Sequence, residues 1–158
     1  MKTEQLFIDL SKIVGKKNII TNAEDLTKYN NDWRGFYNNK SLCVLFPESV
    51  NIIKKIVTYC YKKNIKIVPQ GGNTSLTGAS VPTYHNKEII INFAKLNKIL
   101  EIDKSNLTIL VESGSILANI KEYLDKQNYY FPIDLSSSGS CMIGGNIATN
   151  AGGINALK

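Results

Sequence analysis

Two segments of small and polar residues constrain the structure of this chain more than any other feature. The first, residues 69–78, reads PQGGNTSLTG and directly follows an apolar segment. Glycine adopts positive φ and lets a backbone approach a ligand closely. Consecutive N–H groups in such a turn form an anion-binding concavity, to which amide and hydroxyl side chains add donors. We therefore favour a phosphate-binding loop here over a plain strand-to-strand turn.

The second segment, residues 136–153, reads SSSGSCMIGGNIATNAGG. Small residues at almost every position suit close packing against a flat ligand or another backbone. A flexible linker is the alternative, but Ile143, Ile147 and the absence of charge disfavour it, because a solvated linker is polar throughout. The first segment matches neither GxGxxG nor GxxxxGK followed by Ser or Thr. A Rossmann fingerprint and a P-loop are therefore both excluded there.

The hydrophobic pattern around these segments predicts alternating strands and helices. Ser49 is placed to cap a helix whose apolar residues recur at helical spacing up to Cys60. Because this helix separates two short apolar strands within about 30 residues, we expect a βαβ unit with parallel pairing. The predicted helices cover 5–14, 49–60 and 114–124, the predicted strands cover 42–46, 65–68, 88–93 and 107–112, and 29–40 is expected to be an extended loop.

Composition narrows the class of partner. The formal net charge is +6, but Arg34 is the only arginine and the lysines form no run longer than two, so we expect no nucleic-acid interface. No segment has the ~18 apolar residues of a membrane span and the start is no secretory signal. We expect cytoplasmic localisation and no transmembrane segment, with peripheral membrane association left open. The cysteines, Cys43, Cys60 and Cys141, have no CxxC or zinc spacing, so reduced thiols and no metal site are expected.

With these motifs in hand, the chain resembles the FAD-binding domain of the vanillyl-alcohol-oxidase/PCMH type. The resemblance runs from about Asp32 to the last residue, and the subfamily it resembles most contains D-2-hydroxyglutarate, D-lactate and glycolate dehydrogenases. Two long motifs in the right order make the resemblance specific. The segments that carry it are 68–78, 81–82, 134–135, 139–141 and 143–153, with support from 29–33 and 111–114.

This resemblance implies an α+β fold, with a small parallel sheet, a second mixed sheet, flanking helices and FAD between the sheets. Residues 1–40 would form an N-terminal helix and extended segment, and 41–158 a partial PCMH-type FAD-binding domain, incomplete at the C-terminus. Pro69 and Gly78 would shape the first loop. The implied cofactor-binding residues are Pro69, Gln70, Gly71, Gly72, Asn73, Thr74 and Ser75 around the pyrophosphate, and Ser138, Gly144, Gly145, Asn146, Thr149 and Gly152 beside the flavin.

The resemblance also bears on how the flavin is held. Some relatives bond FAD covalently through a histidine of the first loop, and Asn73 stands about where that histidine would be. The only histidine of the chain, His85, lies in a polar turn beyond the loop and is interpreted as a surface residue. We therefore expect non-covalent FAD.

The implied activity is that of an FAD-dependent D-2-hydroxyacid dehydrogenase. Such an enzyme passes a hydride from the substrate α-carbon to the flavin, and the electrons onward to an acceptor other than NAD. Family members are longer, and a substrate or cap domain supplies their catalytic groups. We therefore assign no catalytic residue here and expect a second chain with the cap domain as a partner. Alternatives are the FAD subunit of a glycolate oxidase assembly, a non-catalytic remnant of a split gene, and a simple anion-binding module.

Overall fold

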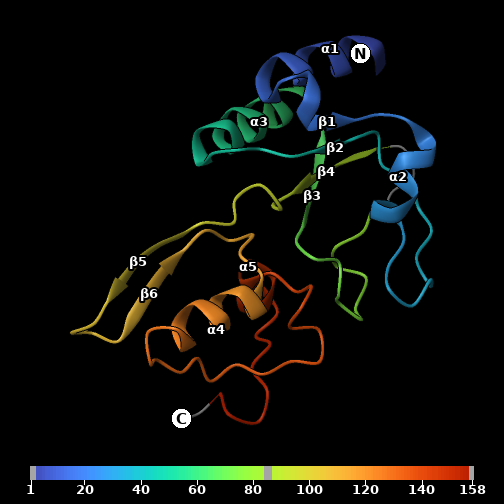
Figure 1. Cartoon of the computed structure of the whole chain (residues 1–158). Helices are drawn as coiled ribbons and strands as arrows, with labels where there is room; N and C mark the ends of the chain where they lie inside the picture. The colour runs from blue at the N-terminus through green and yellow to red at the C-terminus, as the bar shows by residue number, and fades with distance from the viewer. Residues whose placement is uncertain (1–2, 84–86, 157–158) are drawn as a thin grey trace. The chain divides into compact units, whose positions relative to one another are not determined.

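The computed structural model describes residues 3–83 and 87–156. The chain divides into two compact units, Met1–Lys95 and Leu96–Lys158, each described by itself below (Figure 1). The expected boundary near residue 40 falls inside the first unit and stays a prediction. His85, interpreted above as a surface residue, lies outside the described residues.

The first unit is built on a four-stranded sheet with the order β1-β2-β4-β3. The strands β2, β4 and β3 are parallel to one another. The edge strand β1 pairs antiparallel with β2. All five residues of β4 are buried, which accounts for its inner position. The strands are β1 Ile19–Ile20, β2 Val44–Leu45, β3 Lys66–Gln70 and β4 Glu88–Asn92.

The prediction that β2 and β3 pair directly is wrong. They run parallel, but β4 lies between them and pairs with both, with Ile90 opposite Val44 on one side and Val68 on the other. The physical reason is the apolar character of β4 on both faces. Ile89 belongs to the core cluster on one face and Ile90 to the cluster on the other, so β4 is stable only inside the sheet.

Helices cover both faces of this sheet. The helices α1 (Thr3–Val14) and α3 (Val50–Lys63) bury Leu10, Ile56 and Cys60 against one face. On the other face, α2 (Ala23–Asn30) buries Leu26 against Val44, Val68 and Ile90. As predicted, the Ser49 hydroxyl caps α3 by accepting the Ile52 N–H at 3.3 Å. A single turn of 3₁₀ helix, Lys16–Asn18, links α1 to β1.

The segment after α2 forms a loop closed by one carboxylate. Asp32 is buried and accepts the backbone N–H of Tyr37 at 2.8 Å and of Arg34 at 3.2 Å. These backbone hydrogen bonds, the Tyr37 one first, lower the pKa of Asp32. The predicted extended loop is thus confirmed from residue 31 onward, while its first two residues end α2.

The second unit pairs β5 (Ile99–Asp103) with β6 (Thr108–Val111) and packs α4 (Leu117–Asp125) against them through Ile120 and Leu124. The resemblance implied a mixed second sheet, but the pair among the described residues is antiparallel. The four residues between the strands are too few for a crossover connection, which explains the pairing. With helices and sheets in both units, the α+β class is confirmed.

One helix lies where the sequence predicted only a glycine-rich loop. The helix α5, Ile143–Ala148, falls inside the segment 136–153. The sequence did not predict this helix because its helix propensity is low: two of its six residues are glycine. Searching the described residues, we find no helix with the length and apolar character of a transmembrane span.

Candidate cofactor-binding site

The first predicted loop begins at the end of β3, where Pro69 is exposed and Gln70 is buried. The Gln70 side-chain amide donates to the carbonyls of Tyr29 and Ser80, both at 2.8 Å. Its oxygen accepts from the Asn92 side chain at 3.2 Å. The side chain of Gln70 therefore faces into the protein, where it joins the start of the loop to its far end and to α2.

A second amide, that of Asn73, holds the middle of the loop. Its nitrogen donates to the Asn31 carbonyl at 2.7 Å, and its oxygen accepts the Ser80 hydroxyl at 2.7 Å. The backbone of Asn73 is left-handed, with φ 53°. Gly78 also has positive φ (72°), and a Cβ there would overlap the ring of Tyr37. The expected positive φ is thus found at Asn73 as well as at a glycine.

The backbone amides from Gly71 to Ser75 form no hydrogen bond in the part of the chain that the structure describes. Within residues 3–83 and 87–156, no acceptor lies within hydrogen-bond distance of the N–H groups of Gly71, Gly72, Asn73, Thr74 or Ser75. All five residues are partly buried. The Ser75 hydroxyl contacts Thr77 (2.9 Å), whereas the Thr74 side chain has no recorded partner among the described residues. Five consecutive free donors suit an anion with several acceptor oxygens, such as a pyrophosphate.

The second predicted segment belongs to the other unit, where it runs antiparallel to the residues before α4. The Gly144 N–H donates to the Ser113 carbonyl at 2.8 Å, and the Ile143 N–H donates to the Ser115 carbonyl at 2.9 Å. A Cβ on Gly144 would lie 2.7 Å from the Ser113 Cβ. Glycine is therefore required at 144 by packing within the protein.

Its neighbour Gly145 has the opposite environment. Gly145 is exposed, and no atom lies within 4 Å of the position of its missing Cβ. The Thr149 hydroxyl donates to the Gly145 carbonyl at 2.9 Å, one turn along α5. Gly145 thus leaves open backbone surface at the start of this helix, which could accept a flat ligand.

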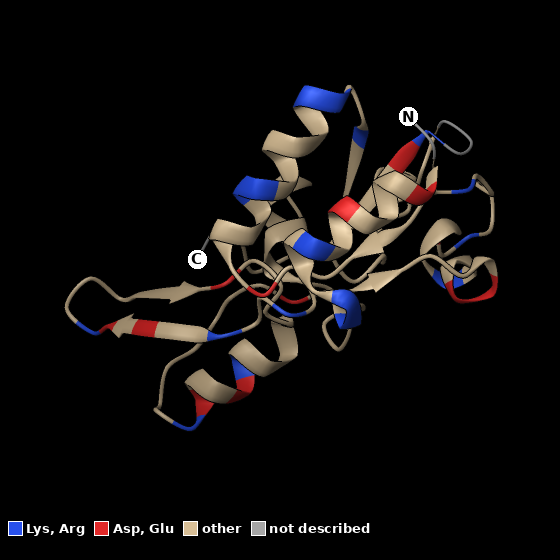
Figure 2. Cartoon of the chain, turned by 90° about the horizontal axis from the view of Figure 1, so that it is seen from above, with Lys and Arg blue, Asp and Glu red and all other residues tan. Residues whose placement is uncertain are grey.

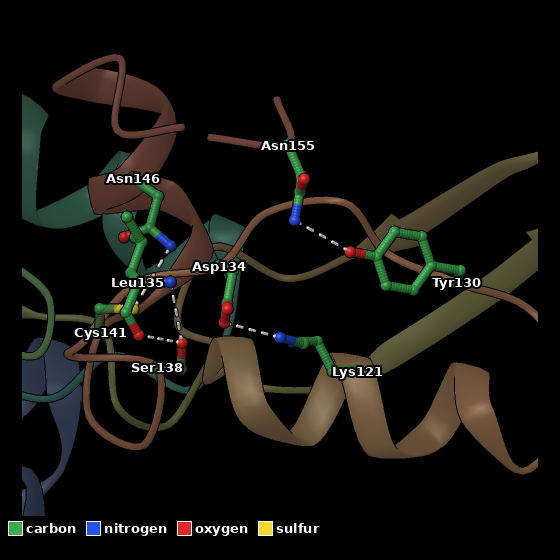
Figure 3. A network of polar contacts seen from close by, with 8 residues as sticks. All are labelled: Lys121, Tyr130, Asp134, Leu135, Ser138, Cys141, Asn146 and Asn155. Atoms are coloured by element: carbon green, nitrogen blue, oxygen red, sulfur yellow. Dashed lines mark hydrogen bonds and ion pairs between the residues drawn. The ribbon is translucent and has the colours of Figure 1, made fainter. Parts of the chain in front are cut away.

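The remaining residues of this segment make internal contacts, which Figure 3 shows. Asn146 is buried, and its amide points to the Cys141 sulfur at 3.5 Å. The Ser138 hydroxyl donates to the Leu135 carbonyl and closes a tight turn. A Cβ on Gly152 would meet the Ala156 Cβ at 2.8 Å.

A surface ion pair joins α4 to the irregular segment just before this turn. Lys121 on α4 donates to the Asp134 carboxylate at 2.9 Å (Figure 3), and this hydrogen bond raises the pKa of Lys121. Gly153 has φ 85°, and a Cβ there would overlap the Asp134 carbonyl oxygen. The chain from 134 to 153 is thus held in one conformation by internal contacts, which argues against the flexible-linker alternative.

The structure therefore brings the first-loop residues together in one unit and the second set together in the other. Sequence reasoning missed the groups that hold them, chiefly Tyr29, Ser80, Asn92 and Ser113. Tyr29 and Ser113 lie in segments that support the resemblance, but no pattern in the sequence shows which carbonyl an amide will reach.

The α+β fold and a loop whose amides have no partner among the described residues are typical of proteins that bind phosphate groups. Comparison with known proteins identifies the family. Residues 41–158 match the FAD binding domain family. The chain belongs to this family, so the predicted cofactor, FAD, is confirmed.

Curated relatives agree with the subfamily that the motifs indicated. The mitochondrial D-2-hydroxyglutarate dehydrogenase of Arabidopsis thaliana is 40% identical over 147 residues, 93% of this chain and 26% of that protein. The D-2-hydroxyglutarate dehydrogenase of Stutzerimonas stutzeri (strain A1501) is 32% identical over 158 residues, 100% of this chain and 34% of that protein. The chain spans about a quarter to a third of the length of these relatives.

Solved structures confirm the fold. An alkyldihydroxyacetonephosphate synthase aligns with a TM-score of 0.85 at 20% identity, over 96% of this chain and 30% of its own. p-Cresol methylhydroxylase aligns with a TM-score of 0.79 at 21% identity, over 91% of this chain and 28% of its own. At these identities the likeness concerns the fold alone, and that fold is the vanillyl-alcohol-oxidase/PCMH type.

Proposed function

We propose that this chain binds FAD non-covalently and serves as the flavin-binding part of an FAD-dependent D-2-hydroxyacid dehydrogenase. The observation that carries the proposal is the row of backbone N–H groups from Gly71 to Ser75 that have no hydrogen-bond partner in the described part of the chain. These donors would hold the pyrophosphate of FAD. Gln70 and Asn73 act as positioning residues, since their side chains fix the loop from inside.

Non-covalent attachment is supported by the chemistry of the loop. An amide such as that of Asn73 is a poor nucleophile, and both ends of this one are already hydrogen-bonded within the protein. The hydroxyl groups of Thr74 and Ser75 are also weak nucleophiles without an adjacent base. The loop is therefore suited to hold a phosphate by hydrogen bonds alone.

The second segment would provide contacts to the flavin. Gly145 offers exposed backbone with no Cβ, and the exposed Thr149 caps the C-terminal end of α5 one turn away. We interpret Gly144, Ser138 and Asn146 as residues that keep this surface in shape through their internal contacts. Bound FAD supplies the two-electron acceptor that oxidation of a 2-hydroxyacid needs.

The substrate class comes from the relatives, which are named as dehydrogenases of D-2-hydroxyglutarate and, for a Schizosaccharomyces pombe protein that is 40% identical, as a putative D-lactate dehydrogenase. Substrate binding requires groups that hold the α-carbon beside the flavin. We propose that a polypeptide outside these 158 residues, a second chain, supplies them.

We propose a reducing compartment, the cytoplasm, for this chain. Cys43, Cys60 and Cys141 are all buried as free thiols. Burial raises the pKa of Cys43 to about 12 and that of Cys60 to about 11, so both stay protonated. Buried thiols without disulfides are typical of reducing compartments.

FAD titration of matched variants tests the binding site. Thr74→Asp places a carboxylate beside the free amides without breaking a recorded hydrogen bond, and Ala79→Asp places one at an exposed position of the same loop. Two like charges about 5 Å apart repel by about 1–3 kcal/mol at effective dielectric constants of 20–80. We expect Thr74→Asp to weaken FAD binding about 10-fold and Ala79→Asp to change it little.

Riboflavin, which lacks the pyrophosphate, is the ligand control. If the loop binds phosphate, Thr74→Asp leaves riboflavin affinity unchanged, and ADP competes with FAD. Equal weakening of FAD and riboflavin would contradict the assigned role of the loop. A protein that retains no flavin absorption through gel filtration, at any FAD concentration, would contradict the proposed function itself.

A further inference from the structure

The outward face of α3 carries an exposed apolar stripe that the proposed flavin site does not use. Val50 is 73% exposed, Val57 44% and Tyr61 87%. Spacings of seven and four residues place these three side chains along one line of a helix. The line extends over about 16 Å at 1.5 Å per residue. Apolar side chains this exposed contribute nothing to the core of the unit.

Lysines flank this stripe. Lys54, Lys55 and Lys62 line a shallow groove along α3, together with Asn51, Thr58 and Tyr59 of the same helix and Ile13 of the adjacent α1. These lysines form no ion pair with any described residue. The sequence of α3 contains no Asp or Glu, and Figure 2 shows only Lys and Arg bands along it.

Asp9 and Glu48, an acidic residue bonded to α3 and one just before it, already have partners. Asp9 on α1 accepts the Tyr59 hydroxyl at 2.8 Å, which is the main cause of its lowered pKa, and it also senses the positive charges of Lys12 and Lys63. Glu48, before α3, binds Lys95 at 2.9 Å. The charges of Lys54, Lys55 and Lys62 therefore stay available to an external anionic partner.

We propose that α3 docks this chain onto an anionic lipid bilayer. The lysines would contact headgroup phosphates, while Val50, Val57 and Tyr61 enter the interface between headgroups and acyl chains. Exposed apolar residues beside lysines on one helix face are the pattern of interfacial membrane helices, and tyrosine favours this depth. A bilayer needs no matching pocket, which suits a straight, convex helix better than an acidic protein partner does.

Sedimentation with lipid vesicles tests this proposal on the full chain. Vesicles of phosphatidylcholine alone are compared with vesicles containing 30% phosphatidylglycerol (roughly the anionic content at which polybasic surfaces bind). Each lysine near such a surface contributes about 5-fold in affinity. We expect Lys54→Glu with Lys62→Glu to lower binding to anionic vesicles at least ~25-fold, and Tyr61→Asp to weaken it as well.

The matched control reverses two exposed lysines of the second unit, Lys98→Glu with Lys104→Glu, which changes the net charge equally. We expect this control to retain most of the binding. Equal loss in both double variants would overturn the proposal, because net charge alone would then explain binding. Absence of anionic-vesicle binding, equal binding to neutral vesicles, or an unaffected Tyr61→Asp would overturn it too. Retention on polyglutamate beads without vesicle binding would instead indicate an acidic protein partner.

Discussion

Replacing each of the two adjacent glycines of α5 by alanine should change the free energy of unfolding in opposite directions. Gly144→Ala adds a methyl group 2.7 Å from the Ser113 Cβ and 2.8 Å from the Ser113 carbonyl oxygen. Gly145→Ala adds it where no atom lies within 4 Å. Both changes favour the helix by about 0.5–1 kcal/mol through backbone entropy. Any difference between them therefore reports the packing at Gly144.

The magnitude follows from these contacts. Overpacking a tight site costs about 1–3 kcal/mol, and displacing the 2.8 Å hydrogen bond from Gly144 to Ser113 costs about 1 kcal/mol more. After subtraction of the helix gain, we expect Gly144→Ala to lower the free energy of unfolding by about 1–3 kcal/mol. Gly145→Ala should raise it by up to about 1 kcal/mol.

Denaturant unfolding of the flavin-free protein, followed by circular dichroism, measures both values. Flavin titration then separates stability from binding, since Gly145→Ala should weaken FAD binding although it stabilises the fold. Equal unfolding free energies for the two variants would refute the packing role of Gly144. Unchanged FAD affinity in Gly145→Ala would remove Gly145 from the binding site.

Three other substitutions test the contacts described above. Gln70→Leu should destabilise the protein by about 2–4 kcal/mol in denaturant unfolding, because it removes hydrogen bonds to the Tyr29 and Ser80 carbonyls and to the buried Asn92 side chain. The control Gln127→Leu should have little effect, because the Gln127 side chain makes no hydrogen bond with any described residue. Gly78→Ala should destabilise through its clash with the Tyr37 ring and through its positive φ. A double-mutant cycle with Tyr37→Ala measures the steric part as the coupling energy, and the cost of positive φ remains as the effect of Gly78→Ala in the Tyr37→Ala background. Burial and, after it, the hydrogen bond to Asp9 raise the pKa of Tyr59 to about 12, so the contribution of Tyr59 to stability is complete below pH ~10 and is lost as pH rises through about 12. Tyr59→Phe should therefore flatten the alkaline limb of the stability profile, and an unchanged limb would contradict this assignment.

Local signals in the sequence predicted the elements that they specify directly. The hydroxyl of Ser49 and the apolar spacing after it identified α3, and the glycines of residues 69–78 identified the loop after β3. The order of the strands was not predictable in this way. The place of β4 between β2 and β3 depends on long-range burial of Ile89 and Ile90, which no local pattern records.

The site shows the same division between local and long-range information. The motif predicted which residues surround the cofactor, but the direction of each side chain depends on partners far along the chain. Gln70 and Asn73 face inward because carbonyls 41 and 42 residues earlier accept from them. The helix α5 was missed because packing against Ser113, rather than propensity, stabilises it.

The first loop is held in part by residues that precede the matched family domain. The family match begins at residue 41, but the carbonyls that hold Gln70 and Asn73 belong to Tyr29 and Asn31. A chain that begins at residue 41 would contain both motifs and still lack two of the acceptors that fix the loop. Residues within the N-terminal 40 therefore stabilise the first loop through these hydrogen bonds. Any fragment made for flavin-binding studies should retain them.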